Sequence, residues 1–136
     1  MVIVIDTSII IDHLRRRSVG GFTLLEQLIE KFSSEDSITV SLITIQELYR
    51  GLSTRNISEE QRLLQVISPY ATLPYTYEVA ELAGKITRDS KVPVEFADAA
   101  IAATAILNDA SLATLNKRHF KDISGLELFE LDTGTS

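Results

Sequence analysis

Four polar side chains interrupt otherwise apolar stretches of this sequence, and they are its candidates for chemistry. Asp6 ends an apolar run, Glu47 lies opposite the apolar stripe of a predicted helix, Asp98 is the only ionisable residue of an alanine-rich stretch, and Asn116 follows a predicted strand. Oxygen ligands without His or Cys suit Mg²⁺ or Mn²⁺, which keep some of their waters and bridge to phosphate oxygens. The set therefore points to metal-assisted attack on a phosphodiester.

Each of these residues, taken alone, also has a purely structural explanation. Asp6 could cap the next helix, and Asp98 could be a first-turn acid that the helix dipole favours. Glu47 could be a solvated helix residue, and Asn116 could occupy its turn for conformational reasons. Their common placement, past strand ends or in the helices between strands, favours the chemical interpretation.

The residues around Asp6 bear on its role. Thr7 or Ser8 can cap the helix that runs to about Arg16, which would leave Asp6 available for a metal ion. Asp12 lies one apolar turn further on, and we expect it at the surface.

Basic residues follow the same candidate positions. The triplet that begins at Arg15 follows Asp6, Arg50 follows Glu47, and Lys117 and Arg118 follow Asn116. A run of charges is most often a solvated face, but local basicity beside an acidic, metal-loaded cleft is what an anionic polymer would require. His119 is expected to be a surface or partly packed residue, with a phosphate contact as the alternative.

Composition bounds the class of protein. The 136 residues include 13 Lys and Arg against 19 Asp and Glu, so the net charge of −6 argues against a general polyanion-binding surface. No cysteine is present, which excludes disulfides and thiolate metal sites. The sequence lacks both a signal-peptide pattern and an apolar run of about 20 residues, so we expect a cytoplasmic protein without membrane contact.

Strand patterns alternate with helix patterns along the chain. We expect strands at 2–5, 38–40, 71–73, 111–114 and 126–131, and helices at 8–16, 22–32, 42–52, 58–68, 77–89 and 95–107. The expected caps of the later helices are Ser41, a capping box at Ser58–Gln61, and Thr76.

This alternation predicts an α/β fold, a three-layer α/β/α sandwich with a central, mainly parallel sheet. We expect a single domain at 1–132 and a disordered tail at 133–136. In such sheets, sites gather beyond the carboxyl ends of the strands, where Asp6 and Asn116 are placed.

Four segments carry a family resemblance. "VIVIDTSIIIDHL", "ITIQELYRGL", "FADAAIAATAI" and "LATLNKRHFKDISGLELFEL" resemble, in this order, the motifs of PIN-domain proteins, particularly the short VapC-type toxins. The resemblance covers essentially the whole chain. It implies a PIN-like nuclease fold and a metal-dependent endoribonuclease that hydrolyses RNA with Mg²⁺ or Mn²⁺. It also implies a small cognate antitoxin that occludes the site, and a homodimer.

The resemblance also implies roles for individual residues. Asp6, Glu47 and Asp98 would form the acidic metal site. Asn116 stands where many members have a fourth aspartate and others an asparagine, which leaves one charge fewer for a second metal ion.

Neighbouring residues would support this site. Ser8 and Thr114 would hold the carboxylates by hydrogen bonds, and Gly51 would let its helix approach a neighbour or the substrate. Glu95 is an additional acid that we do not expect to be a ligand. RNA contacts would come from the basic residues at 15, 50, 117 and 118.

Two other functions remain open for the same residues. A phosphohydrolase could use Asp6 as an aspartyl nucleophile, but such enzymes usually carry a second aspartate where this chain has Ser8. A catalytically silent PIN-like module could bind RNA or protein; Asn116 keeps this alternative open, and the three acids argue against it.

Overall fold

The computed structural model describes residues 1–17, 20–32 and 36–131. The tail predicted at 133–136 lies outside the described residues. No helix in these ranges is both long and apolar enough to cross a membrane.

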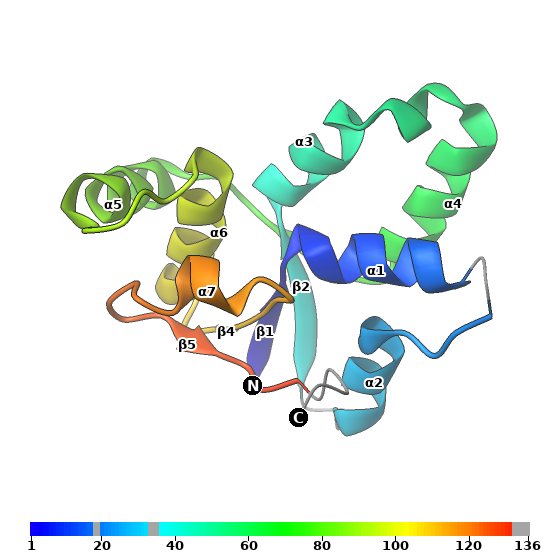
Figure 1. Ribbon diagram of the computed structural model, residues 1–136, viewed down its shortest axis with the longest axis horizontal. Helices are drawn as coiled ribbons and strands as arrows, with labels where there is room; N and C mark the ends of the chain where they lie inside the picture. The colour runs from blue at the N-terminus through cyan, green and yellow to red at the C-terminus, as the bar shows by residue number, and fades with distance from the viewer. Residues whose placement is uncertain (18–19, 33–35, 132–136) are drawn as a thin grey trace.

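A five-stranded sheet forms the centre of the molecule (Figure 1). Strand β1 (Val2–Ile5) lies between β2 (Ser37–Ser41) and β4 (Ser111–Ala113), and β3 (Ala71–Leu73) and β5 (Glu127–Leu128) form the edges. All four pairings are parallel, as predicted. Strand β1 is central because its β-branched side chains are buried on both faces of the sheet.

Helices cover both faces of this sheet, which confirms the three-layer prediction (Figure 1). They are α1 (Thr7–Arg17), α2 (Leu24–Lys31), α3 (Leu42–Arg50), the 3₁₀ helix η1 (Leu52–Arg55), α4 (Ile57–Ile67), α5 (Tyr77–Asp89), α6 (Phe96–Leu107) and α7 (Lys117–Phe120). Because side chains alternate along a strand, Ile3 and Ile5 pack towards α1, α2 and α4. Val4 packs on the opposite face, against α6 and α7. Helix α5 packs outside α6.

The helix caps were predicted with mixed success. Ser41 and Thr76 cap α3 and α5 as expected, each accepting a bond from a backbone N–H of the first turn. The capping box predicted at Ser58 is wrong. The Asn56 side chain caps α4 by accepting a bond from the backbone N–H of Glu59, so α4 begins earlier and Ser58 lies inside it.

The boundaries of several elements also differ from the predictions; the helix expected at 42–52, for example, ends at Arg50. The helix expected at 22–32 begins at Leu24, because Thr23 forms a capping box with Glu26 and leaves Phe22 outside. The strand expected at 126–131 is only two residues long, since the neighbouring β4 is itself short. Helix α7 was not predicted.

Asp12 is not the surface residue that we expected. Its side chain is 9% exposed and accepts bonds from Arg16 Nε at 2.7 Å and from the backbone N–H of Leu24 at 3.2 Å. The chain folds back after α1, so Asp12 ties α1 to the start of α2.

Candidate active site

Asp6 lies directly after β1 and is 3% exposed. Its backbone N–H donates to the carbonyl of Ala113 at 2.9 Å, which fixes it at the carboxyl edge of the sheet. The Asp6 Oδ2 atom accepts hydrogen bonds from Ser8 Oγ and from Thr114 Oγ1, both at 2.8 Å. The two residues named as supports therefore hold one oxygen of this carboxylate from two different elements.

The cap assignment for α1 is wrong. Thr7 and Ser8 are the first two residues of the helix, and the carbonyl of Asp6 accepts the bond from the Ile9 N–H at 3.0 Å. Asp6 is therefore the residue that precedes α1, and its backbone carbonyl accepts the first hydrogen bond of the helix. The hydroxyls of Thr7 and Ser8 bond instead to carboxylates of the candidate site.

Glu47 lies on α3 and is only partly exposed. Its Oε1 atom accepts a hydrogen bond from Thr7 Oγ1 at 2.7 Å, and Thr7 Oγ1 is also 3.2 Å from Thr44 Oγ1, which is fully buried. Glu47 is therefore not a freely solvated helix residue. Sequence reasoning missed Thr7 as its holder because the hydroxyl directly after Asp6 was interpreted as a cap.

Asp98 lies in the first turn of α6, with its side chain 17% exposed. The pKa of Asp98 is raised to about 6, chiefly by burial and next by the negative charge of Asp6, while His119 acts in the opposite direction. Glu95 and Glu47 add smaller increases to this pKa. The candidate acids thus share one electrostatic environment although they come from different elements.

His119 is the second residue whose role at this site sequence reasoning did not assign. Its Nδ1 atom is 3.4 Å from Asp98 Oδ2, and its side chain is 44% exposed. The sequence feature that could have indicated this role is its position three residues after Asn116; the structure places both residues at α7, a helix that was not predicted.

Asn116 is brought to the same edge through its backbone. Its N–H donates to Thr114 Oγ1 at 2.9 Å, and the residue occupies the position before α7. Its side chain is exposed and forms no hydrogen bond within the described residues. The structure therefore places Asn116 beside the strand end without a side-chain hydrogen bond to any of the three acids.

The oxygens of the three acids suit a hard divalent cation. Across residues 1–17, 20–32 and 36–131, no group of three or more acidic or His side chains is arranged so that it could hold a metal ion. Asp6, Glu47 and Asp98 nevertheless each have one oxygen engaged and a second without a protein hydrogen bond in this part of the chain. No buried side-chain polar atom there lacks a partner, so the free Asp6 Oδ1 reaches solvent. A divalent cation would offset the repulsion that raises the pKa of Asp98.

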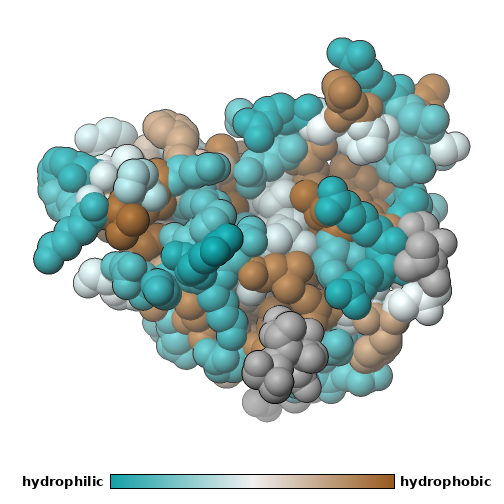
Figure 2. Space-filling model, in the orientation of Figure 1, coloured by the Kyte–Doolittle hydropathy of each residue, from teal (hydrophilic) through white to brown (hydrophobic). Residues whose placement is uncertain are grey.

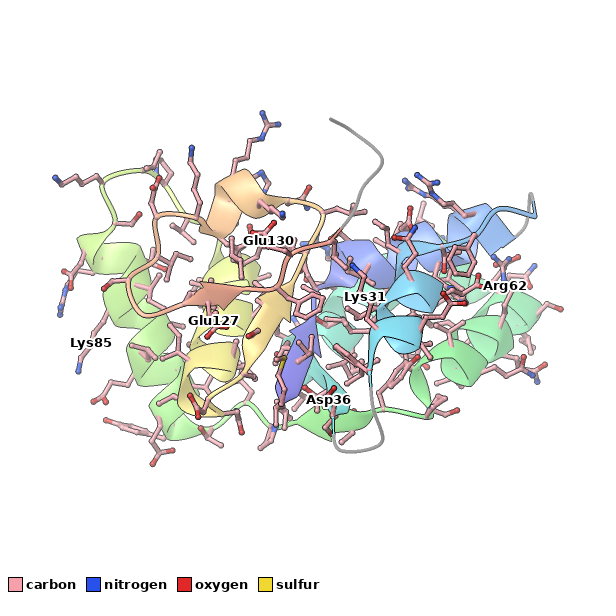
Figure 3. All side chains as sticks on the ribbon, turned by 90° about the horizontal axis from the view of Figure 1, so that it is seen from below. Lys31, Asp36, Arg62, Lys85, Glu127 and Glu130 are labelled. Carbon is pink, nitrogen blue, oxygen red and sulfur yellow. The ribbon has the colours of Figure 1, made fainter. Side chains whose placement is uncertain are left out.

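The predicted RNA-binding cations are distributed unevenly. Arg15 lines a cavity of about 440 Å³ that also contains Glu47, and Arg118 lines a cavity of about 510 Å³ that also contains Asp98. Arg50 is exposed and lines neither cavity. Lys117 is paired at 2.7 Å with Glu130, which Figure 3 labels.

Gly51 ends α3 and lines the cavity beside Glu47. A Cβ atom at this position would lie 3.3 Å from the Leu48 carbonyl oxygen, so a side chain would crowd the end of the helix.

Thr7→Val should weaken the site without unfolding the protein. Valine keeps the shape of threonine but cannot donate a hydrogen bond to Glu47. We therefore expect either the Mg²⁺ concentration for half-maximal activity to rise or the activity to fall, by roughly 10- to 100-fold. The measurement is the Mg²⁺ dependence of RNA cleavage. Thr87→Val removes a hydroxyl that bonds to a carbonyl within α5 and serves as the matched control. Equal behaviour of the two variants would contradict the positioning role of Thr7.

Comparisons with known proteins agree with this architecture. Residues 3–126 match the family model described as "PIN domain". "Ribonuclease VapC19" of Mycobacterium tuberculosis is 34% identical over 119 residues, which cover 85% of this chain and 90% of that protein. "Ribonuclease VapC1" of Rickettsia felis is 32% identical over 142 residues, with 98% of each chain covered.

Solved structures share the fold. A VapBC2 complex from Rickettsia felis, bound to a DNA fragment from its promoter, superposes with a TM-score of 0.79 at 21% identity and covers 95% of this chain and 98% of that one. A toxin–antitoxin complex from Klebsiella pneumoniae has a TM-score of 0.69 at 28% identity, with 90% and 93% covered.

Proposed function

Because this chain belongs to the PIN domain family, we propose that it is a metal-dependent endoribonuclease and the toxin of a VapBC-type toxin–antitoxin pair. The observation that carries the proposal is the common environment of three carboxylates. Asp6, Glu47 and Asp98 come from the end of β1, from α3 and from α6, and each has one oxygen held and one free.

In this proposal the three carboxylates hold Mg²⁺ or Mn²⁺. When bound, the ion neutralises charge on the phosphodiester and lowers the pKa of water. Ser8 and Thr114 keep Asp6 in one orientation and leave its other oxygen available to the ion.

Two further residues complete the proposed arrangement. Glu47, held through one oxygen by Thr7, has its second oxygen available to bind the ion or to accept a proton from the attacking water. Asn116, whose side chain is exposed beside the strand end, would hold a water of the site.

The partners follow from the relatives. The proposed substrate is RNA, and the proposed protein partner is a small cognate antitoxin in the cytoplasm, by analogy with the toxin–antitoxin complexes of similar fold. We also propose a homodimer, supported by apolar side chains such as Tyr77 and Phe96, which are 78% and 80% exposed.

The test is cleavage of end-labelled RNA by the purified chain. We expect internal cuts with Mg²⁺ or Mn²⁺ and none with EDTA, because the carboxylates alone cannot neutralise a phosphodiester. A single-stranded DNA of the same sequence serves as the substrate control. Absence of metal-dependent cleavage, together with absence of stabilisation by Mg²⁺, would indicate a silent PIN-like module instead.

A further inference from the structure

A cavity of about 510 Å³ opens beside Asp98, and we call it the Asp98-side cavity. Its walls are the segment between α5 and α6, with Val92, Pro93 and Val94, and the α7 region, with Arg118 and Lys121. His119 also lines it and is 3.4 Å from Asp98, so the cavity is continuous with the candidate site. Its volume falls within the range of small-ligand sites.

The cations of this cavity are available to a ligand. Arg118 and Lys121 are exposed and form no hydrogen bond or ion pair within the described part of the chain. The cavity beside Glu47 differs, because its Arg62 already donates to the Leu14 carbonyl and pairs with Glu59. Hydrophilic side chains cover the part of the surface where α7 lies (Figure 2). Within the described residues, the Asp98-side cavity is therefore lined by two cations, Arg118 and Lys121, whose side chains have no partner.

The wall between α5 and α6 presents aliphatic side chains. Val92 is 55% exposed and Pro93 is also exposed, while Ile123, which follows α7, adds an 8% exposed side chain to the lining. Exposed aliphatic side chains next to free cations match the two halves of a nucleotide, an apolar base face and a phosphate.

The acids that line the cavity bear on how a nucleotide would be oriented in it. Glu95 and Asp122 also line it, and a phosphate close to them would be repelled. Glu95 belongs to the wall between α5 and α6, whereas Asp122 shares the other wall with two cations, so the net charge favours a phosphate at the Arg118–Lys121 wall and leaves the base against the wall that carries Glu95. Carboxylates accept hydrogen bonds from exocyclic amino groups, which adenine, cytosine and guanine carry and uracil lacks.

We propose that the Asp98-side cavity binds one nucleotide of the RNA strand next to the scissile phosphate. Its phosphate contacts Arg118 and Lys121, and its amino-bearing base packs on Pro93 and Val94. This inference rests on the proposed ribonuclease function and adds a nucleotide subsite to it.

Binding is the first test, measured on the Asp6→Asn background so that the RNA stays intact. Fluorescence anisotropy follows a labelled single-stranded RNA with Mg²⁺ over a range of salt concentrations. Arg118→Ala/Lys121→Ala should weaken binding roughly tenfold. The plot of log K against log salt should become shallower by roughly 1.4, about 0.7 for each cation that no longer neutralises a phosphate.

The control removes the same two charges elsewhere. Lys85→Ala/Arg88→Ala lies on α5, where both side chains are exposed, are paired with Glu81 and Asp89, and do not line the Asp98-side cavity (Figure 3 labels Lys85). We expect its binding and salt slope to stay near those of the parent. Because all four side chains are exposed, we expect both double variants to melt at the temperature of the parent. That result would exclude unfolding as the cause of weaker RNA binding.

Cleavage by the otherwise unsubstituted chain is the second test. In Arg118→Ala/Lys121→Ala, KM should rise roughly tenfold with kcat little changed, since binding rather than chemistry is affected. Removing the nucleotides on one side of the mapped cut should erase most of this difference, because the phosphate that the two cations contact is then absent. Placing uracil there should raise KM for the parent and for the double variant alike, because the phosphate contacts remain.

The outcomes separate the two hypotheses. Identical binding, salt slope and KM for the two double variants would overturn the nucleotide subsite and leave the ribonuclease function standing. Failure of the unsubstituted chain to cleave RNA with Mg²⁺ would overturn the proposed function, while the anisotropy comparison would still decide whether the cavity binds a nucleotide.

Discussion

Asp6→Asn and Asp98→Asn should each lower kcat for Mg²⁺-dependent RNA cleavage by at least roughly 10²- to 10³-fold while the protein stays folded. Asparagine keeps the shape and one acceptor oxygen of aspartate but removes the charge that would hold the ion. At position 6, that acceptor can still bond to Ser8 and Thr114, so the strand end is preserved. The measurements are single-turnover cleavage rates and circular dichroism.

Asp109→Asn is the matched control. Asp109 is exposed in the turn between α6 and β4 and has a φ of 51°, a conformation that asparagine adopts readily. This variant should cleave RNA at the parent rate. If Asp6→Asn or Asp98→Asn cleaved as fast as Asp109→Asn, the assignment of the acids would be wrong.

The metal-free protein should lose the contribution of Asp98 to its stability as the pH rises from about 4 to above 6. The pKa of Asp98 is raised from 3.8 to about 6 in the folded state, chiefly by burial and by Asp6. The folded chain therefore holds a proton that the unfolded chain has already released, and this contribution to stability is complete below about pH 4 and lost above about pH 6. Thermal unfolding in EDTA across this pH range measures the effect.

Mg²⁺ should reverse this loss, and more strongly at pH 7 than at pH 5, because the ion binds the ionised carboxylates. An ion concentration of 100 times Kd stabilises by about 2.7 kcal/mol, which corresponds to a rise in melting temperature of roughly 5–10 °C for a chain of this size.

The Asp6→Asn variant provides the internal check on both effects. Removing the charge at position 6 should bring the pKa of Asp98 closer to 3.8, so the pH-dependent loss should shrink. The stabilisation by Mg²⁺ should shrink as well. A Mg²⁺ response equal in the parent and in this variant would contradict a metal site at Asp6.

Much of the fold could be predicted because its signals are local. Val2–Ile5 is apolar and β-branched throughout, which only a strand buried on both faces satisfies. Ser41 and Thr76 directly precede helical patterns, and a cap needs only the next turn of backbone to act. The α/β alternation then restricts the sheet to parallel pairings.

The sequence-based predictions were wrong where two nearby residues could both cap a helix, or where a later helix folds back against an earlier one. Asn56 and Ser58 are both good caps, and the sequence pattern at Ser58 favoured the wrong one. Asp12 looked exposed by its helical position, but the backbone N–H of Leu24 comes close to its carboxylate only because α2 returns against α1.

The sequence by itself determined which residues are candidates for chemistry, because a lone carboxylate in an apolar stretch is costly to bury without a partner. The tertiary structure decided which groups meet. The Thr7–Glu47 and Thr114–Asp6 bonds join residues 40 and 108 positions apart, and the His119–Asp98 contact joins two helices. Periodicity encodes the face on which a side chain lies but not the partner that faces it, since that depends on how the helices pack on the sheet. For the same reason, only the structure shows that the side chains of Arg118 and Lys121 have no partner among the described residues and line the cavity beside Asp98, where we propose that a nucleotide binds.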